Sequence, residues 1–325
     1  MKKYLITGVA GFIASVVAEM LLDQGSEIVG LDNLNHAYDV RMKEYRLAKL
    51  NKHPGFSFLK LDVSDQNLLH NIQLTGQGFT AVINLAARAG VRDSLKDPWV
   101  YMDTNATGTL NLLELCRQEN IPKFILASTS SIYGEDAPLP TPETAPSNKP
   151  LQAYAASKKA AEAMAHAYHF LYGVDVSIVR YFTVYGPAGR PDMVMFRFCK
   201  WIYEDMPVHL FGDGDQSRGF TYVDDIARGT ISALKLVGYE ILNLGGHEVM
   251  TINELIAGLE KKIGKEAEIV FHTKHPADMY TNQADVSKAK SLLDWEPEVS
   301  LEDGIEKLVD WYQRERAWVK NIKTD

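Results

Sequence analysis

The stretch Thr7-Gly8-Val9-Ala10-Gly11-Phe12-Ile13-Ala14 decides the fold of this chain of 325 residues. The residues before it, Lys3–Thr7, form a short apolar run that predicts a buried strand, and the pattern after it predicts a helix from Gly11 to Gln24. Two glycines allow a tight turn and let the backbone approach a diphosphate at the helix N-terminus. The stretch therefore predicts a dinucleotide-binding turn.

An acidic residue stands where such a turn needs one. Asp32 ends the next predicted strand, Glu27–Asp32, at the distance from the glycines at which a carboxylate binds a ribose 2′-hydroxyl. That position favours NAD over NADP. The alternative is an ordinary glycine-rich turn with a surface aspartate. Ala14 replaces the third glycine, at a position that governs helix–strand packing and tolerates alanine.

Strand and helix patterns alternate from the N-terminus to Tyr181, which is typical of a parallel sheet covered on both faces. We predict an α/β fold, a Rossmann-type doubly wound parallel sheet, over residues 1–181. A smaller, interleaved α/β domain for the substrate is expected over residues 182–325. One of its strands, near 240–244, is expected to return to the large sheet.

Composition limits the possible partners. The chain is 46% hydrophobic and 23% charged, with a net charge of -8, which argues against nucleic acid and anionic membranes as partners.

The sequence predicts no metal site, because no acidic or sulfur ligand completes a site with His166 and His169. No apolar run reaches transmembrane length, and the predicted first strand leaves no room for a signal peptide. We expect a cytoplasmic protein.

The segment from Ser128 to Lys158 predicts a catalytic centre. The predicted strand Lys123–Ser128 ends beside Thr129, and Tyr154 and Lys158 share one face of the helix that follows. A lysine cation beside a tyrosine favours the phenolate, so Tyr154 is a candidate general base. The Thr129 hydroxyl is placed to hydrogen-bond the same substrate oxygen. The spacing alone is weak evidence, because unrelated helices also contain Tyr-x-x-x-Lys.

The ordered set of motifs resembles the extended short-chain dehydrogenase/reductase family over essentially the whole chain. The motifs are Thr7-Gly-x-x-Gly-Phe-Ile, Asp32, Leu85-Ala-Ala87, Asn105-x-x-Gly-Thr, Thr129, Tyr154-x-x-x-Lys158 and Arg180-Tyr-Phe. The resemblance implies a tightly held NAD, a nucleotide-sugar substrate, and a homodimer formed by the helices near 98–118 and 151–171. It also implies cofactor contacts from a larger set: Gly8, Gly11, Phe12, Ile13, Asp32, Asn33, Asp62, Val63, Leu85, Ala86, Ala87, Asn105, Tyr154, Lys158 and Tyr181.

Two serines bear on the reaction. Ser130 and Ser131 occupy positions where related dehydratases and decarboxylases carry an acidic residue, so elimination of water or carbon dioxide is disfavoured. Oxidation followed by reduction at the same carbon, an epimerisation at C4, is favoured instead. The segment from Arg180 to Met193 is similar to that of the UDP-glucuronic acid 4-epimerases, and Thr183 stands where enzymes for neutral sugars usually have Asn.

Arginines are the candidates for binding the anionic groups of the substrate. Arg190 can pair bidentately with a C6 carboxylate, helped by the hydroxyls of Thr183 and the two serines, although it could also be a surface arginine. Arg218 is the diphosphate candidate, with Gly219 where the family usually has Asp. The resemblance adds Arg92 and Asp278 as substrate contacts.

The sequence therefore predicts an isomerase: NAD-dependent C4 epimerisation of UDP-glucuronic acid to UDP-galacturonic acid through a 4-keto intermediate. A 4-epimerase for UDP-glucose and UDP-galactose, or for another UDP-sugar, stays open. An inactive NAD-binding scaffold or sensor is the alternative of another class, although Thr129, Tyr154 and Lys158 are all present.

Overall fold

The computed structural model describes residues 1–246, 248–273 and 281–324. Its main sheet has seven strands, and every pair of neighbours is parallel. In spatial order they are β10 (Tyr239–Leu244), β6 (Asp175–Tyr181), β5 (Lys123–Thr129), β4 (Ala81–Asn84), β1 (Lys3–Thr7), β2 (Glu27–Leu31) and β3 (Phe56–Leu59). The chain runs outward from β1 to β3 and then reverses to β4. The predicted doubly wound parallel sheet is confirmed.

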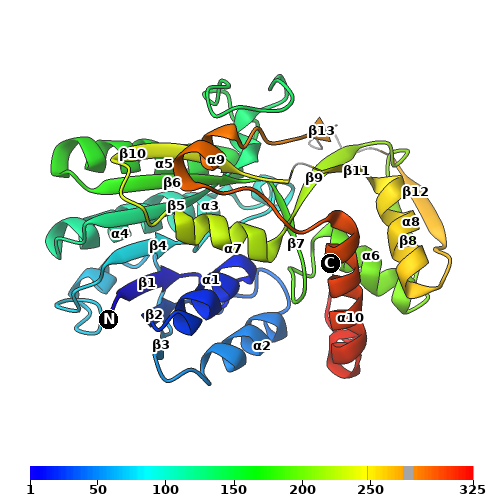
Figure 1. Ribbon diagram of the computed structural model, residues 1–325, viewed down its shortest axis with the longest axis horizontal. Helices are drawn as coiled ribbons and strands as arrows, with labels where there is room; N and C mark the ends of the chain where they lie inside the picture. The colour runs from blue at the N-terminus through cyan, green and yellow to red at the C-terminus, as the bar shows by residue number, and fades with distance from the viewer. Residues whose placement is uncertain (247, 274–280, 325) are drawn as a thin grey trace.

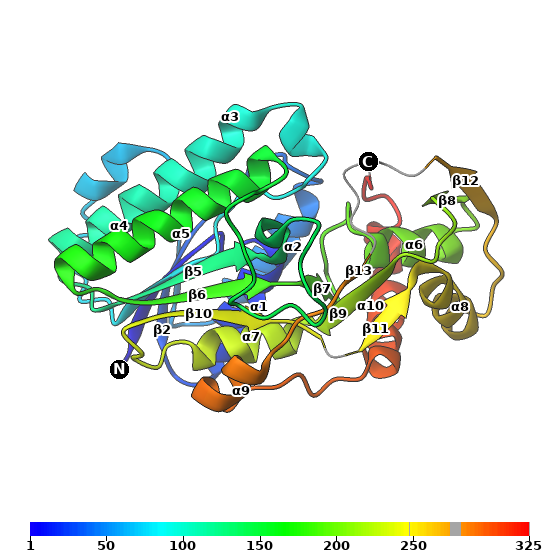
Figure 2. The same ribbon diagram turned by 90° about the horizontal axis from the view of Figure 1, so that it is seen from above.

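Side chains alternate between the two faces of this sheet, and each face has its own helical layer. In β5, Phe124 and Leu126 belong to one apolar core, and Ile125 and Ala127 belong to the other. Figure 2 shows one layer along one side of the sheet and α7 and α9 along the other. The helices are α4 (Gly108–Gln118) and α5 (Ala153–Tyr172) in the first layer, and α1 (Phe12–Asp23), α7 (Val223–Ser232) and α9 (Ser287–Leu293) in the second. The helix α2 (Arg41–Leu50) packs against α1.

The long helix predicted over 98–118 is interrupted. It consists of α3 (Pro98–Tyr101), a π-helical turn η3 (Met102–Thr107) and α4. Asn105 lies in the π-helical turn, and such turns often occur at functional sites. Among the described residues, three 3-10 turns also connect larger elements: η1 (Gln66–His70), η2 (Asp93–Leu95) and η4 (Ser130–Tyr133).

The rest of the chain packs beside the carboxyl ends of the large sheet. Figure 1 shows this part on the right, with α10 (Leu301–Val319) upright. A third apolar core joins α6 (Val194–Tyr203), α8 (Ile252–Ile263) and α10. The small strands are β7 (Thr183–Tyr185), β9 (Ser217–Tyr222), β11 (Val249–Thr251) and β13 (Thr281–Asn282) in one sheet, and β8 (Val208–Phe211) and β12 (Ile269–His272) in another. In the described ranges, no helix combines the length and the apolar character that a membrane crossing needs.

Candidate active site

A cavity of about 770 Å³ lies between the carboxyl ends of the large sheet and the smaller part of the chain. Parallel strands end at one edge of a sheet, which is where ligands of such folds bind. Predicted site residues from both parts of the chain therefore meet here. Those that line the cavity are Gly8, Gly11, Phe12, Ile13, Asp32, Asn33, Val63, Leu85, Ala86, Ala87, Arg92, Thr129, Ser130, Ser131, Tyr154, Lys158, Tyr181, Thr183, Arg190 and Arg218.

Two predicted cofactor residues do not line the cavity. The Asp62 carboxylate accepts a hydrogen bond of 2.7 Å from Asn33, which does line it. Asn105 is buried, and its side chain bonds the backbone N–H and carbonyl of Arg88 at 2.8 and 3.0 Å and the hydroxyl of Ser157 at 2.9 Å. Asn105 thus holds the loop after β4 against α5. A third predicted residue, Asp278, lies outside the described residues.

The glycine-rich turn has the shape that a dinucleotide requires. Gly8 has a φ of 68°, and a Cβ atom there would meet the backbone of Ala86 at 2.8 Å. A Cβ at Gly11 would meet the carbonyl oxygen of Gly8 at 2.7 Å. Both positions therefore exclude side chains, and the backbone surface at the start of α1 stays open to a diphosphate. These residues fit NAD.

Asp32 is already neutralised by a lysine that the motifs did not reveal. The ammonium of Lys43 lies 3.2 Å from Asp32 Oδ1, and both side chains are buried. The backbone N–H of Leu34 donates to the same oxygen at 2.8 Å. Asp32 Oδ2 has no hydrogen-bond partner in the described part of the chain, so this oxygen is the one suited to a ribose hydroxyl.

Thr129, Tyr154 and Lys158 line the same cavity, but their electrostatics differ from the expectation. Burial raises the pKa of the Tyr154 phenol, while a hydrogen bond with Thr129 and the charge of Arg190 act to lower it. Lys158 is not among the groups that lower the pKa of Tyr154. Its ammonium donates to the carbonyl oxygen of Ala127 at 2.9 Å. In the protein alone, burial therefore opposes the phenolate that the sequence predicts beside a lysine cation.

Burial also affects Lys158, and an acidic residue one helical turn further on opposes it. Burial lowers the pKa of Lys158 to about 8, and the charge of Glu162 raises it. Glu162 itself is held by two hydrogen bonds from Arg180, at 2.9 and 2.8 Å, and by one from Ser128 at 2.7 Å. Glu162, Arg180 and Ser128 form a buried cluster one helical turn from Lys158. Their hydrogen bonds hold α5 against β5 and β6.

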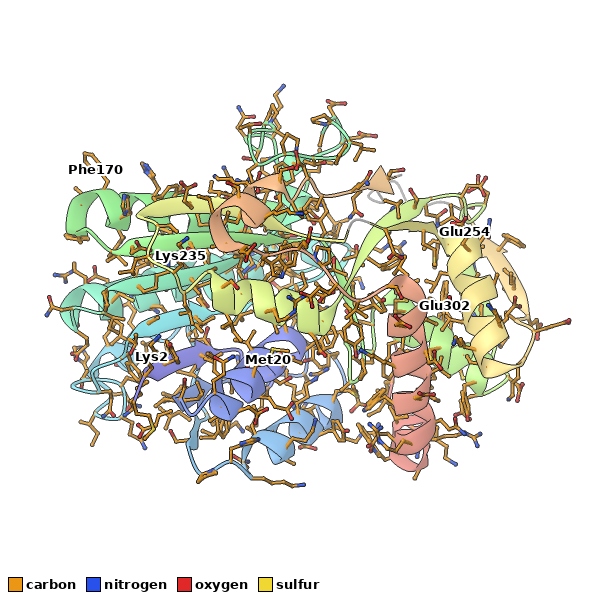
Figure 3. All side chains as sticks on the ribbon, in the orientation of Figure 1. Lys2, Met20, Phe170, Lys235, Glu254 and Glu302 are labelled. Carbon is orange, nitrogen blue, oxygen red and sulfur yellow. The ribbon has the colours of Figure 1, made fainter. Side chains whose placement is uncertain are left out.

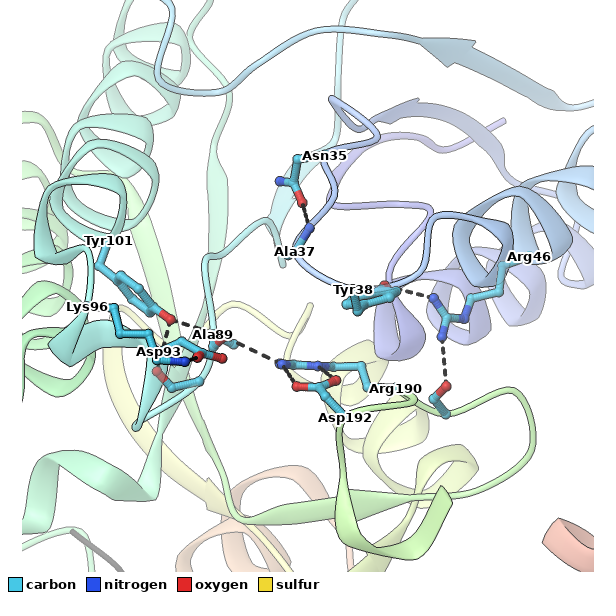
Figure 4. A network of polar contacts seen from close by, with 12 residues as sticks. Asn35, Ala37, Tyr38, Arg46, Ala89, Asp93, Lys96, Tyr101, Arg190 and Asp192 are labelled. Atoms are coloured by element: carbon cyan, nitrogen blue, oxygen red, sulfur yellow. Dashed lines mark hydrogen bonds and ion pairs between the residues drawn. The ribbon is translucent and has the colours of Figure 1, made fainter. Parts of the chain in front are cut away.

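Arg190 lines the part of the cavity where the sequence predicts the sugar carboxylate. Its Nε atom donates to Asp192 Oδ1 at 3.1 Å, and its Nη2 atom lies 2.5 Å from Oδ2 and 3.4 Å from the carbonyl of Ala89. Figure 4 shows this pair between Ala89 and Tyr38. Nη1 has no hydrogen-bond partner among the described residues. Asp192 thus occupies one edge of the guanidinium, and the edge that carries Nη1 remains for an anionic ligand.

Hydroxyl groups complete this end of the cavity. Thr129 Oγ1 lies 3.2 Å from Ser131 Oγ and accepts from the Ser131 backbone N–H, also at 3.2 Å. Ser130 and Thr183 line the same cavity. Three serine and threonine residues at 129–131 thus offer hydroxyls beside Tyr154, and none of them can act as a carboxylic acid or base.

Gly219 stands where the family usually has Asp, and the structure gives a steric reason for the glycine. A Cβ atom at Gly219 would approach the carbonyl oxygens of Gly246 and Asn282 at 3.2 and 3.3 Å. The Gly219 N–H instead donates to the Asn282 side chain at 3.2 Å. Arg218 next to it lines the cavity and donates to the carbonyl of Ser217 at 2.7 Å.

The fold and the site define an extended short-chain dehydrogenase/reductase: a doubly wound sheet, a glycine-rich turn, and a Thr-Tyr-Lys centre at the sheet's carboxyl edge. The profile of the NAD dependent epimerase/dehydratase family matches residues 4–245, and the chain belongs to this family.

Its relatives include both uronate and neutral-sugar enzymes. A UDP-glucuronate 4-epimerase of Thermodesulfobacterium geofontis is 54% identical over 98% of this chain and 99% of that protein. The crystal structure of a UDP-glucuronic acid 4-epimerase from Bacillus cereus with UDP-glucuronic acid and NAD matches with a TM-score of 0.90 and 38% identity, covering 96% of this chain and 99% of that one. A UDP-glucose 4-epimerase from Thermotoga maritima with UDP-glucose matches with a TM-score of 0.89 and 31% identity, over 97% of this chain and 99% of that one.

Proposed function

We propose that this protein converts UDP-glucuronic acid into UDP-galacturonic acid by epimerisation at C4, with NAD as its bound cofactor. The observation that carries the proposal is the open edge of Arg190 in a cavity that also contains Tyr154 and the hydroxyls of Ser130 and Ser131. The open Nη1 of the guanidinium can donate a charge-assisted hydrogen bond to a carboxylate. The 54% identity to a UDP-glucuronate 4-epimerase supports the same substrate.

The cofactor is bound by the glycine-rich turn and Asp32. Gly8 and Gly11 would leave room for the diphosphate, and the free Asp32 Oδ2 would accept a hydrogen bond from a ribose hydroxyl. When bound, NAD supplies the group that accepts the C4 hydride and gives it back. Leu85, Ala86 and Ala87 line the wall of the cavity next to the glycine turn.

Tyr154 moves the proton of the C4 hydroxyl. As the hydride leaves C4, Tyr154 accepts that proton, and it returns the proton when the hydride comes back to the opposite face of the sugar. Thr129 holds the oxygen during both steps. The raised pKa of Tyr154 suits the return step, because the phenol stays protonated until the ketone is reduced. Tyr154 must be a phenolate before it accepts the proton and becomes one again after it returns the proton, and Lys158 as a cation stabilises that phenolate.

The carboxylate needs special control in the keto intermediate. A 4-keto uronate is a β-keto acid, which loses carbon dioxide when the bond to the carboxylate aligns with the ketone π system. We propose that Arg190, helped by Thr183, Ser130 and Ser131, holds the carboxylate out of that alignment. Arg218 is the proposed contact of the diphosphate and Arg92 a further substrate contact, and both line the cavity.

The competing function is 4-epimerisation of a neutral UDP-sugar, which the similarity to the Thermotoga maritima enzyme favours. The test is to compare kcat/KM for UDP-glucuronic acid and UDP-glucose in the same preparation. We expect kcat/KM for UDP-glucuronic acid to exceed that for UDP-glucose by about tenfold or more, because one charge-assisted hydrogen bond contributes about 1.5–3 kcal/mol. Equal values, or a preference for UDP-glucose, would contradict it.

We also propose that the protein forms a homodimer and is located in the cytoplasm. Helices α3 and α5 expose large apolar side chains, and Figure 3 shows Phe170 pointing away from the body at the end of α5. Trp99 is 76% exposed and Phe170 is 79% exposed, which favours a homodimer through this face. A mass from light scattering tests the dimer. The two buried, unpaired cysteines, Cys116 and Cys199, fit a reducing compartment such as the cytoplasm.

A further inference from the structure

Arg46 is a buried arginine that belongs to none of the predicted motifs. It lies on α2, and only 3% of its surface is exposed. Its Nε and Nη2 atoms donate to the carbonyl of Ala188 at 2.9 and 2.7 Å, and Nη2 also donates to the carbonyl of Gly189 at 3.0 Å. Nη1 donates to the carbonyl of Ala10 at 3.1 Å and to the Tyr38 hydroxyl at 2.9 Å. These five bonds use all five N–H donors of the side chain.

The charge of Arg46 has no acidic partner among the described residues. In the part of the chain that the structure describes, Arg46 forms no ion pair, and all its acceptors are neutral oxygens. The rings of Phe12 and Tyr38 lie 6.0 and 5.6 Å from its guanidinium. A buried charge without a counter-ion is costly, and it persists where its hydrogen bonds fix an arrangement that an apolar side chain could not.

The arrangement that Arg46 fixes joins the two ends of the active site. Ala10 belongs to the glycine-rich turn, while Ala188 and Gly189 directly precede Arg190. Ala188 has a φ of 53°, in the left-handed region that residues with a Cβ seldom adopt, so this turn needs support from outside. Arg46 supplies that support with two bonds to the Ala188 carbonyl.

Tyr38 gives Arg46 a second route to Arg190. Its hydroxyl accepts from Arg46, and its ring lies 5.8 Å from the Arg190 guanidinium. Figure 4 shows Tyr38 next to both arginines, with Arg46 on the side of α2 and Arg190 on the side of Ala89. The backbone before Arg190 and the aromatic ring beside it are therefore both tied to one side chain on α2.

We propose that Arg46 is a positioning residue for Arg190. It locks the turn of residues 188–190 against the glycine-rich turn, so that the open edge of Arg190 keeps a fixed direction toward the sugar carboxylate. This inference rests on the proposed function, because the carboxylate is the group that Arg190 would hold. Loss of Arg46 should therefore change which product forms, beyond any change in overall rate.

The test uses two variants and a matched control on the same helix. Arg46→Lys keeps the charge but cannot reach both turns, and Arg46→Met removes charge and donors together. Arg41→Lys is the control, because Arg41 is 46% exposed on its side chain and bonds Asp39 and the carbonyl of Asn321 instead. The holoenzyme is incubated with UDP-glucuronic acid, and proton NMR gives the ratio of UDP-pentose to UDP-galacturonic acid. Hydrogen exchange of a peptide covering 183–193 is measured in parallel.

We expect both Arg46 variants to raise the pentose ratio by about tenfold, since small misplacements of a positioning group have large effects, and to speed exchange in 183–193. The control should change neither. Unchanged exchange overturns the proposal. Faster exchange with an unchanged product ratio also overturns it, because the turn would then be loosened without effect on Arg190. If Arg46→Met does not fold, Arg46→Lys decides. If the wild type leaves UDP-glucuronic acid unaltered, the proposed function fails, and the exchange arm still decides whether Arg46 fixes the turn.

Discussion

The guanidinium of Arg190 and the carboxylate of Asp192 form a two-point ion pair, with Nε to Oδ1 at 3.1 Å and Nη2 to Oδ2 at 2.5 Å. The two residues are two positions apart in one loop. The pair fixes the plane of the guanidinium and leaves the edge with Nη1 for a ligand. An arginine held in this way meets an incoming carboxylate without first having to be ordered.

Replacing Arg190 with alanine should weaken the uronate reaction and change its products. The loss of a charge-assisted hydrogen bond of about 1.5–3 kcal/mol lowers kcat/KM on the order of 10- to 100-fold. The freed carboxylate then aligns with the ketone more often, so the fraction of UDP-pentose rises. Proton NMR of the products measures both. An exposed arginine, Arg314, provides the control substitution to alanine. A product ratio equal to that of the wild type would remove Arg190 from its assigned role.

Replacing Asp192 with asparagine should tighten binding of the uronate and also loosen its orientation. The neutral amide would no longer balance the charge of Arg190, so the guanidinium attracts the substrate carboxylate more strongly. Titration calorimetry should show a lower Kd for UDP-glucuronic acid and no change for UDP-glucose, while the fraction of UDP-pentose rises. Equal shifts for both sugars would mean that Asp192 acts on something other than the carboxylate site.

The pH dependence of turnover should reflect Lys158. Its pKa is lowered to about 8 by burial, so its ammonium is lost, and activity falls, as the pH rises through about 8. Glu162 stabilises that ammonium. Glu162→Gln should therefore lower the pKa of Lys158 further and move the alkaline limb of kcat to lower pH. Glu114→Gln, an acid whose partners are Arg117 and Tyr168, is the control.

The Glu162 substitution also unpairs a buried arginine. Arg180 then loses its carboxylate partner, which costs about 3–5 kcal/mol of folding free energy. Thermal unfolding is therefore recorded alongside the pH profile, and the profile is taken well below Tm. An alkaline limb that stays in place, in a folded variant, would show that Lys158 does not set it.

The glycine-rich turn allows a matched pair of substitutions. Gly8 and Gly25 have φ values of 68° and 80°, so alanine costs about 1–2 kcal/mol at either position. A Cβ at Gly8 would also meet Ala86 at 2.8 Å, whereas nothing lies within 4 Å of a Cβ at Gly25. Gly8→Ala should purify with far less NAD than the wild type, and Gly25→Ala should retain it. Equal NAD content in both would place the cofactor elsewhere.

The sequence predicted the parts of the site that follow directly from strand ends and short motifs. Gly8, Asp32 and Thr129 line one cavity because parallel strands deliver them to the same edge of the sheet, and Tyr154 reaches that cavity from the first turn of α5. The pattern after the glycine-rich turn also predicted the helix from Gly11 to Gln24, and α1 spans Phe12–Asp23. Local patterns are sufficient for such elements, because their own residues determine both the element and its direction.

Other parts depend on contacts that no local pattern contains. Asn105 turns toward Arg88 and Ser157 because a π-helical turn interrupts the predicted long helix. The raised pKa of Tyr154 follows from burial by the whole fold, which the spacing to Lys158 does not reveal.

The sequence also contains an indication of the buried arginine and lysine of α2, although neither residue belongs to a motif. Lys43 and Arg46 are three positions apart, so they share one face of a predicted helix. Both are buried, and both face the active site. Two long cations on the face of a helix that should be apolar indicate a functional or structural contact. The identity of their partners, Asp32 in one case and the 188–190 turn in the other, required the structure.

The central claim is tested most directly by incubating the purified protein with UDP-glucuronic acid, without added NAD, and following the reaction by proton NMR. The account predicts that UDP-galacturonic acid appears and that turnover continues without added cofactor, because NAD stays bound and is regenerated in each cycle. No change in UDP-glucuronic acid, together with turnover of UDP-glucose, would contradict it. UDP-pentose as the main product would equally contradict the role given to Arg190 and the two serines.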